Sequence, residues 1–325
     1  MARHRRHALR RAAVVVVPLA GLLGCSPAVS RSGAGSSTTT AARRPAARYP
    51  VTLHAANGTV TLAARPTAIV SLSPTATEML YAIGAGPQVK AVDESSDYPK
   101  GTPMTKLDGL DPNVEAIASY QPDLVVVSDD PTSLNAQLKA LGVPVLSEPA
   151  ADDLAQEYHQ IDQLGAATGH APTARREVEQ LEHEVSAVVR ATPKPAHPET
   201  YYYELTPTHY SATSSTFIGR VLGRLGLKSI ADAAHGAAAS GGYPQLSAEH
   251  ILQANPDYIF LADTTCCGQS QATVATRPGW ARLGAVRDHR VLGLNDDIAS
   301  RWGPRIVDLL RDVSEELRRH PVARS

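Results

Sequence analysis

Two adjacent cysteines, Cys266 and Cys267, are the residues of this chain best suited to covalent chemistry. They follow DYIFLAD, an apolar run typical of a buried strand, and ligands in α/β proteins bind at the ends of strands. If the two close a small disulfide ring, the ring could serve as an apolar plate that faces a ligand, as a redox-sensitive contact, or as a local staple of the loop. A pair of free thiols is the other alternative. No histidine or cysteine is spaced to complete a metal site with them, so we favour the staple or the free thiols.

Other residues with catalytic or metal-binding potential lack the partners that such chemistry needs. The 12 histidines form no HxxxH, HxH or HExxH arrangement, and there is no GxSxG elbow or phosphate loop. The tyrosines of YYYE, residues 201–204, have phenolate oxygens that suit iron, but neighbouring strand residues point to opposite faces, which favours a packed strand. We therefore predict no enzyme, no bound metal and no cofactor.

The amino-terminal segment indicates the compartment. Residues 1–25 join a basic stretch, MARHRRHALRR, to a short apolar run, AAVVVVPLAGLL, which is typical of an export signal and too short to span a bilayer. The sequence LLGC that ends at Cys25 resembles the lipobox of bacterial lipoproteins, in which the cysteine is acylated. We expect an exported protein, anchored by a lipid on Cys25 to the outer face of the cell membrane, with residues 26–48 as a flexible tether.

Composition limits the classes of partner. The 325 residues suffice for two domains of typical size, and a hydrophobic fraction of 43% with 19% charged residues is typical of a soluble globular protein. A formal net charge of -1 gives no electrostatic support for binding nucleic acid. Because only 5% of residues are aromatic, stacking on a ligand would depend mainly on the 11 tyrosines.

Strand and helix patterns alternate from residue 51 onward. VTLHAANGTVTL, residues 51–62, alternates around Asn57-Gly58 and predicts a hairpin. The strands that follow are apolar nearly throughout, which indicates a parallel sheet covered on both faces. The predicted strands are 68–72, 88–92, 123–127 and 143–146, and the predicted helices are 74–85, 113–120 and 132–141.

A long helix separates this α/β unit from a second one. Residues 172–190 carry one apolar stripe and predict a helix about 28 Å long, which prolines stop from Pro193 onward. The carboxyl ends of the strands of both units should then meet at a shared cleft. The second unit is predicted from strands 201–205 and 290–294 and helices 216–227 and 304–320, and the predicted boundaries are 49–168 for the first lobe, 169–192 for the connecting helix and 193–325 for the second lobe.

One pattern occurs once in each unit. EAIASYQPDLVVV begins at Glu115 and EHILQANPDYIFL begins at Glu249; in both, a short helix is followed by Pro-Asp and an apolar strand. Asn113 and Ser247 can cap these helices, which places each glutamate in a first turn, where the helix dipole favours negative charge. By this argument alone, both are surface carboxylates that complement a dipole.

Longer stretches carry a likeness to one family. RPTAIVSLSPTATEMLYAIGAG and NVEAIASYQPDLVVVS in the first lobe, and GGYPQLSAEHILQANPDYIFLAD and RPGWARLGAVRDHRVLGLNDDIASRWGPRIVDLL in the second, resemble the ABC-importer binding proteins for cobalamin and ferric siderophores. The resemblance implies the class III periplasmic-binding-protein architecture. In that architecture two Rossmann-like lobes with mainly parallel sheets are joined by a single long α-helix and move little on binding.

The resemblance also implies roles for particular residues. One glutamate on each lobe of the family pairs with arginines of the membrane permease, and Glu115 and Glu249 match these positions. Tyr243 and Arg301 match positions where the family places an aromatic ring and a cationic or hydrogen-bonding side chain against the ligand; a guanidinium suits carboxylate, phosphate or catecholate oxygens. The expected ligand-binding residues, taken from the loops after the strands, are Ser73, Thr75, Tyr98, Asp129, Tyr210, Tyr243, Asp297, Arg301 and Trp302.

The sequence departs from the cobalamin-binding members on the first-lobe side of the cleft. Ser95, Gly109 and Ser128 stand where those members place tryptophan or tyrosine, which removes apolar area that would hold a corrin ring. This departure reduces the support for cobalamin as the ligand. A ferric siderophore, a haem-like ring and another corrinoid stay open as candidate ligands.

We therefore predict a monomeric, lipid-anchored solute-binding protein that captures a bulky metal chelate and delivers it to an ABC permease. The alternatives are a sensor or receptor on the same fold without transport, an exported enzyme, and a divalent-metal binder. The glutamate pair separates the first alternative from transport, because a protein that does not dock needs no such residue on each lobe.

Overall fold

A computed structural model of the chain describes residues 49–130 and 133–322. All of these residues belong to one compact unit. Among them, no helix combines the length and the apolar character needed to cross a membrane. The predicted export signal, the lipidation of Cys25 and the tether fall on residues 1–48 and lie outside the described residues.

The predicted hairpin opens the first lobe and is confirmed. Strands β1 (Val51–Ala55) and β2 (Gly58–Leu62) pair antiparallel, and Gly58 has a φ of 103°, in the region that favours glycine. The side-chain amide of Asn57 donates to the carbonyl oxygen of Val145 at 2.8 Å. This bond fixes the turn of the hairpin to the edge of the neighbouring sheet.

Five parallel strands form the first sheet, in the order β5-β4-β3-β6-β7. The chain builds outward from β3 to β5 and then returns to the other side of β3, so the direction of winding reverses between β3 and β6. Ligands of open α/β sheets bind outside the carboxyl ends of the strands at such a point. The strands are β3 (Ile69–Leu72), β4 (Val89–Asp93), β5 (Met104–Leu107), β6 (Leu124–Val127) and β7 (Val145–Ser147), and the helices are α1 (Pro74–Ala82), η1 (Gly86–Gln88), α2 (Val114–Ala118) and α3 (Leu134–Ala140).

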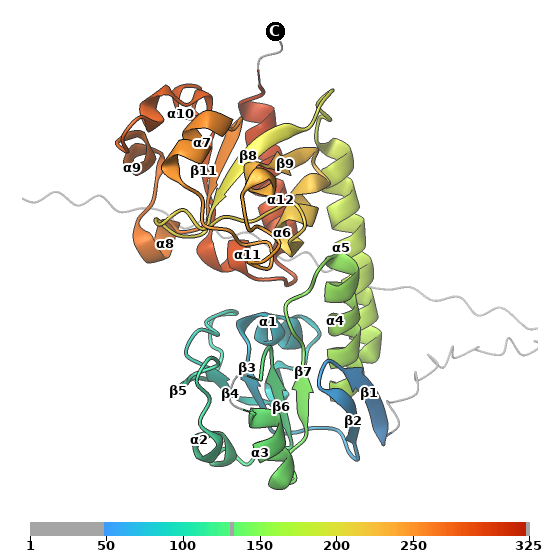
Figure 1. The fold of residues 1–325 in the computed structure, drawn as a ribbon. Coiled ribbons are helices and arrows are strands. Elements are labelled where there is room, and N and C mark those ends of the chain that lie inside the picture. The colour runs from blue at the N-terminus through green and yellow to red at the C-terminus, as the bar shows by residue number, and fades with distance from the viewer. Residues whose placement is uncertain (1–48, 131–132, 323–325) are drawn as a thin grey trace, which may run out of the picture. The chain divides into compact units, whose positions relative to one another are not determined.

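Two long helices bridge the lobes (Figure 1). The expected connecting helix is α5 (Ala171–Ala191), and α4 (Leu154–Thr168), which the sequence analysis did not predict, packs along it. Leu154 belongs to the core of the second lobe and Leu164 to that of the first. Because two packed helices resist bending more than a linker of loops, the lobes are held as a stiff pair. The lobe boundaries at 168/169 and 192/193 stay a prediction.

Four parallel strands form the second sheet, in the order β11-β10-β8-β9, which reverses direction between β8 and β10. In β8 (Glu199–Glu204), Tyr201 and Tyr203 enter one core cluster and Tyr202 enters another, and all three are fully buried. The predicted packed strand is therefore confirmed. The other strands are β9 (Leu227–Ser229), β10 (Tyr258–Leu261) and β11 (Val291–Gly293).

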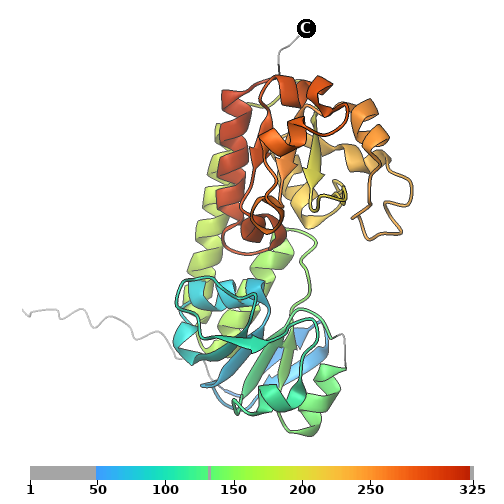
Figure 2. The ribbon, with the colours of Figure 1, turned by 90° about the vertical axis from the view of Figure 1, so that its left-hand side faces the viewer.

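The helices of the second lobe are mostly short. The helix expected over 216–227 ends at Gly223, because Gly226 turns the chain with a φ of 85° and β9 begins at Leu227. The last helix, α12, packs beside α5, as Figure 2 shows. The helices are α6 (Phe217–Gly223), η2 (Ile230–Ala233), α7 (Ala248–Ala254), α8 (Thr264–Cys267), α9 (Gln271–Ala275), η3 (Trp280–Arg282), α10 (Gly284–Arg287), α11 (Asp296–Ser300) and α12 (Ile306–Arg319).

The repeated pattern has a structural reason that the sequence analysis missed. The carboxylate of Asp123, just before β6, accepts hydrogen bonds from the amides of Thr67 and Ala68, just before β3. Asp257, just before β10, accepts in the same way from the amide and hydroxyl of Thr200 in β8. Each Pro-Asp step therefore ties the start of one central strand to the start of its neighbour.

Candidate functional site

The loops at the carboxyl ends of both sheets meet between the lobes. Arg301, which follows β11 and α11, donates to the carbonyl oxygen of Ser95, in the loop after β4, at 2.9 Å. This hydrogen bond joins the second lobe to the first. The loop after β4 and the segment after α11 thus meet between the lobes, beside the carboxyl ends of both sheets, which is where ligands bind in open α/β sheets.

Three half-exposed tyrosines lie in these loops. Tyr98 follows β4, Tyr210 follows β8 and Tyr243 precedes α7, with exposed fractions of 44%, 43% and 42%. Burial raises the pKa of Tyr243, so its phenol stays protonated and can donate a hydrogen bond at neutral pH. Leu110, in the loop after β5, is also strongly exposed, and the sequence analysis did not select it. Exposed aromatic and aliphatic side chains suit the apolar face of a bulky ligand.

A hollow of about 190 Å³ opens beside Tyr243. Phe217, Arg301 and Trp302 line it, and the indole nitrogen of Trp302 donates to the side chain of Gln160 on α4 at 2.9 Å. A hollow of this volume holds only part of a bulky ligand. The rest of such a ligand would lie along the exposed tyrosines of the cleft.

A larger groove of about 770 Å³ lies elsewhere on the first lobe. It runs beside the β1-β2 hairpin and includes Arg65 and Asp123, which precede strands β3 and β6. The groove is therefore at the amino ends of the strands. Ligands of open α/β sheets bind at the opposite, carboxyl ends, where the loops of both lobes meet.

Ser73 and Thr75, two of the expected ligand-binding residues, are buried, at 1% and 3% exposed. The hydroxyl oxygen of Ser73 accepts from the amide of Ala76 at the start of α1 and from the hydroxyl of Ser128. The tight turn from β3 into α1 therefore places Ser73 below the surface as a helix cap. In this structure neither residue offers its side chain to the cleft, which corrects the expectation.

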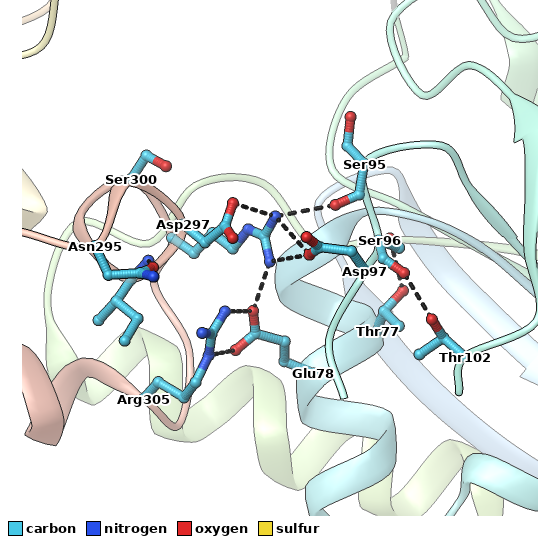
Figure 3. Close-up of polar contacts among 12 residues, drawn as sticks. Thr77, Glu78, Ser95, Ser96, Asp97, Thr102, Asn295, Asp297, Ser300 and Arg305 are labelled. Carbon is cyan, nitrogen blue, oxygen red and sulfur yellow. Dashed lines mark hydrogen bonds and ion pairs between the residues drawn. The ribbon is translucent and has the colours of Figure 1, made fainter. Parts of the chain in front are cut away.

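Arg301 reaches the cleft edge, but protein carboxylates already hold its guanidinium. Nη1 donates to Glu78 at 2.8 Å and to Asp97 at 3.3 Å, and Nη2 donates to Asp297 at 2.8 Å. Figure 3 shows the carboxylates of Glu78, Asp97 and Asp297 converging from both lobes. Arg301, expected to bind an acidic group of the ligand, is instead neutralised within the protein and links the lobes. Asp129, also expected at the site, is exposed at the carboxyl end of β6.

Glu78 accepts from two arginines, and the sequence analysis missed it. Its side chain on α1 is 3% exposed and accepts from Nε and Nη2 of Arg305 at 2.8 and 2.5 Å, in addition to Arg301. The guanidinium of Arg305 lies 4.0 Å from the ring centroid of Tyr98, close enough for a cation–π contact. The available signals were a glutamate inside the apolar run TATEMLYAIG and an arginine four residues after Arg301.

A second buried ionic group, also missed, lies where β8 and β10 adjoin. The carboxylate of Glu204 accepts from both Nη atoms of Arg277, at 2.6 and 2.5 Å, and the carboxyl of Asp263 is buried nearby. Burial and the negative charge of Glu204 raise the pKa of Asp263 to about 7, so that below this pH Asp263 can donate a proton toward Glu204. Because both carboxyl groups are buried, they support the loops above them and do not face a ligand.

Cys266 and Cys267 form a disulfide in α8, at the carboxyl end of β10. Both cysteines are exposed. The carboxylate of Asp296 accepts from the backbone amides of Thr264 and Cys266, each at 2.8 Å, and so fixes this short helix. Although burial opposes it, these hydrogen bonds lower the pKa of Asp296. Whether the disulfide contacts a ligand or only staples the loop stays a prediction.

Glu115 and Glu249 are exposed in the first turns of α2 and α7. The predicted caps are confirmed. The side chain of Asn113 accepts from the amide of Ala116 at 2.8 Å, and that of Ser247 accepts from the amide of His250 at 3.1 Å. Each carboxylate is therefore held at the start of a capped helix and points to no partner that would neutralise it within the described residues.

The buried carboxyl group of Glu148, just after β7, should make the stability of the folded protein depend on pH. It is 4% exposed, one carboxylate oxygen has no hydrogen-bond partner, and burial raises its pKa to about 8. Between the unfolded value of about 4.5 and about 8, the folded state binds the extra proton, so stability falls as the pH rises. Glu148→Gln should raise the free energy of unfolding at pH 9 by at least about 1.4 kcal/mol, the value of one pKa unit, and change it little at pH 4.

Urea unfolding of both proteins at pH 4 and pH 9 measures this difference. Glu94→Gln, which changes an exposed glutamate in the same way, is the control and should leave the stability near the parent value at each pH. If the parent and Glu148→Gln show the same pH dependence, Glu148 is not protonated in the folded state.

The fold and the cleft define a two-lobed binding protein, and the comparisons place it in a family. Residues 69–298 match the periplasmic binding protein family, to which this chain belongs. The uncharacterized ABC transporter substrate-binding lipoprotein YvrC of Bacillus subtilis is 30% identical over 279 residues, which cover 83% of this chain and 86% of YvrC.

Two solved structures share the fold and differ in ligand. The periplasmic vitamin B12 binding protein BtuF of Vibrio cholerae is 25% identical, with a TM-score of 0.66 and coverage of 80% of this chain and 100% of BtuF. The periplasmic heme-binding protein RhuT from Roseiflexus sp. RS-1 is also 25% identical, with a TM-score of 0.65 and coverage of 76% and 96%. Similarity therefore gives the class of protein and leaves the ligand open.

Proposed function

We propose that this chain captures a bulky metal chelate, a ferric siderophore or a corrinoid, between its lobes and delivers it to an ABC permease. The observation that carries the proposal is the cleft at which the carboxyl ends of two parallel sheets meet, with Tyr98, Tyr210 and Tyr243 half exposed along it. The name of YvrC supports a role in transport, and the names of BtuF and RhuT support a metal-containing ring as ligand. A lipid on Cys25 would hold the protein at the outer face of the membrane.

Two alternatives receive less support from the site. A divalent-metal binder needs a cluster of ligating side chains, and residues 49–130 and 133–322 contain no group of three or more histidine, cysteine or carboxylate residues so arranged. An exported enzyme that used acid–base chemistry on a carboxyl group would need one with a perturbed pKa that reaches the cleft. The carboxyl groups with strongly raised pKa values that lie near the cleft loops, Glu148 and Asp263, are instead buried beneath those loops.

Delivery requires a surface that the permease recognises. We propose that Glu115 and Glu249 provide it, one on each lobe, by pairing with arginines of the permease. Their exposure and their capped helices support this role, because a fixed, unpaired carboxylate is available to an external cation. A receptor that does not transport would not depend on these two charges.

Fluorescence titration against cobalamin, haem and a set of ferric siderophores tests ligand capture. The chain has two tryptophans; Trp302 lines the hollow and Trp280 is buried in the second lobe. We expect one class of chelate to quench the emission of Trp302 strongly. Trp302→Phe should lose most of this signal while calorimetry still detects binding. If no metal chelate binds by either method, the proposed ligand class is wrong.

A further inference from the structure

The two arginines at the cleft edge are already neutralised by the protein. Arg301 bonds to Glu78, Asp97 and Asp297, and Arg305 bonds to Glu78. Among the described residues of the loops that follow the strands, Lys100 is the one further lysine or arginine. These edge loops are 94–103, 108–113, 128–130 and 148–153 in the first lobe and 205–216, 230–247, 262–270 and 294–305 in the second.

Exposed carboxylates predominate in the same loops. The first lobe alone contributes two exposed acidic residues from each of three loops, of which Asp97 is already paired with Arg301, against Lys100 as the single cation of these loops. The described residues hold 21 lysines and arginines against 32 aspartates and glutamates, so the negative charge of these loops belongs to a wider excess on the folded part of the chain. The exposed acidic residues of these three loops are Glu94, Asp97, Asp108, Asp111, Asp129 and Asp130.

An anionic ligand would be disfavoured in two ways. It would find no unpaired guanidinium to replace the water that hydrates its charge. It would also enter a region where the neighbouring fixed charges have the same sign, and a cleft with low-dielectric walls focuses such a field. A neutral or cationic ligand meets neither barrier.

We infer that the chelate held between these lobes is neutral or cationic at its periphery and not a polyanion. The inference rests on the proposed function and sharpens its ligand class. It favours a corrinoid with amide side chains, or a ferric hydroxamate, over a ferric tris-catecholate, which carries three negative charges. It also disfavours haem with both propionates ionised.

Matched ligands that differ only in charge test the inference. Cyanocobalamin is compared with its monocarboxylic acid, and haem with its dimethyl ester, by calorimetry of the intact protein at low and high salt. In whichever pair binds, the Kd of the neutral ligand at low salt should be at least about tenfold lower than the Kd of the anionic ligand. The ratio should shrink at high salt, because salt screens the repulsion.

Charge reversal at the cleft edge provides a second test. Glu94→Lys with Asp129→Lys should strengthen binding of the anionic member about tenfold. Glu179→Lys with Glu182→Lys, on the exposed face of α5, makes the same change in net charge away from the cleft. This control should leave the ratio of the affinities for the neutral and anionic ligands at the parent value. Equal or tighter binding of the anionic member by the parent protein overturns the inference. Failure of every chelate to bind overturns the proposed function itself, and the inference with it.

Discussion

Replacing Glu78 with alanine is expected to lower the free energy of unfolding by about 3–5 kcal/mol, the usual loss when one partner of a buried ion pair is removed. The side chain of Glu78 is 3% exposed, and those of Arg301 and Arg305 are 11% and 15% exposed. Without the carboxylate, Arg305 loses the one ion-pair partner that it has among the described residues, in a site with little access for water. Arg301 keeps Asp97 and Asp297, so the loss arises mainly from Arg305.

Urea unfolding with a matched control measures this effect. The ion pair between Glu184 and Arg311 also joins two helices, α5 and α12, but its side chains are 26% and 49% exposed. Glu184→Ala should therefore lower the free energy of unfolding by no more than about 1 kcal/mol. Glu78→Gln keeps the size of the side chain and some of its hydrogen bonds. Its free energy of unfolding should therefore lie between those of the two alanine variants. Similar small losses for both alanine variants would show that the pairs at Glu78 contribute little to stability.

The elements that the sequence predicted well are those whose signal is local. A run such as LVVV before a turn is apolar on both faces, and its strand, β6, is buried throughout. The caps at Asn113 and Ser247 also depend only on residues three positions away. Helix α4 was missed because buried polar residues, among them Glu157 and Gln160, interrupt its apolar stripe.

The site was predicted less completely, because its contacts join distant parts of the chain. Arg301 stands at a position that suits a ligand-binding cation, but Glu78, its strongest partner, lies 223 residues earlier. No local pattern indicates that these side chains meet. Tyr98, Tyr210 and Tyr243 could be selected because exposure at a strand-end loop follows from topology alone. Whether a charged side chain in such a loop is free or paired depends on packing across the cleft.

Reversing both Glu115 and Glu249 to lysine is expected to abolish uptake of the ligand and leave its affinity within about twofold of the parent value. The two residues lie on α2 and α7, in separate lobes, so a permease that contacts both lobes meets one of them on each side. A lysine at either position replaces attraction to a permease arginine with repulsion, and a like-charge contact at an interface costs several kcal/mol. Uptake by cells that lack the parent gene and carry each variant is compared with calorimetry of the purified proteins.

The double reversal needs controls for charge and for location, because either could lower uptake without any role in docking. Glu179→Lys with Glu182→Lys makes the same change in net charge on the exposed face of α5 and should leave uptake intact. All variants should stay in the membrane fraction, whereas Cys25→Ser should release the protein if that cysteine carries the anchor. Each single reversal should lower uptake only in part, because one lobe still docks. Normal uptake by the double variant would remove the docking role and favour a receptor on this fold, whereas loss of both uptake and affinity would point to damage at the cleft.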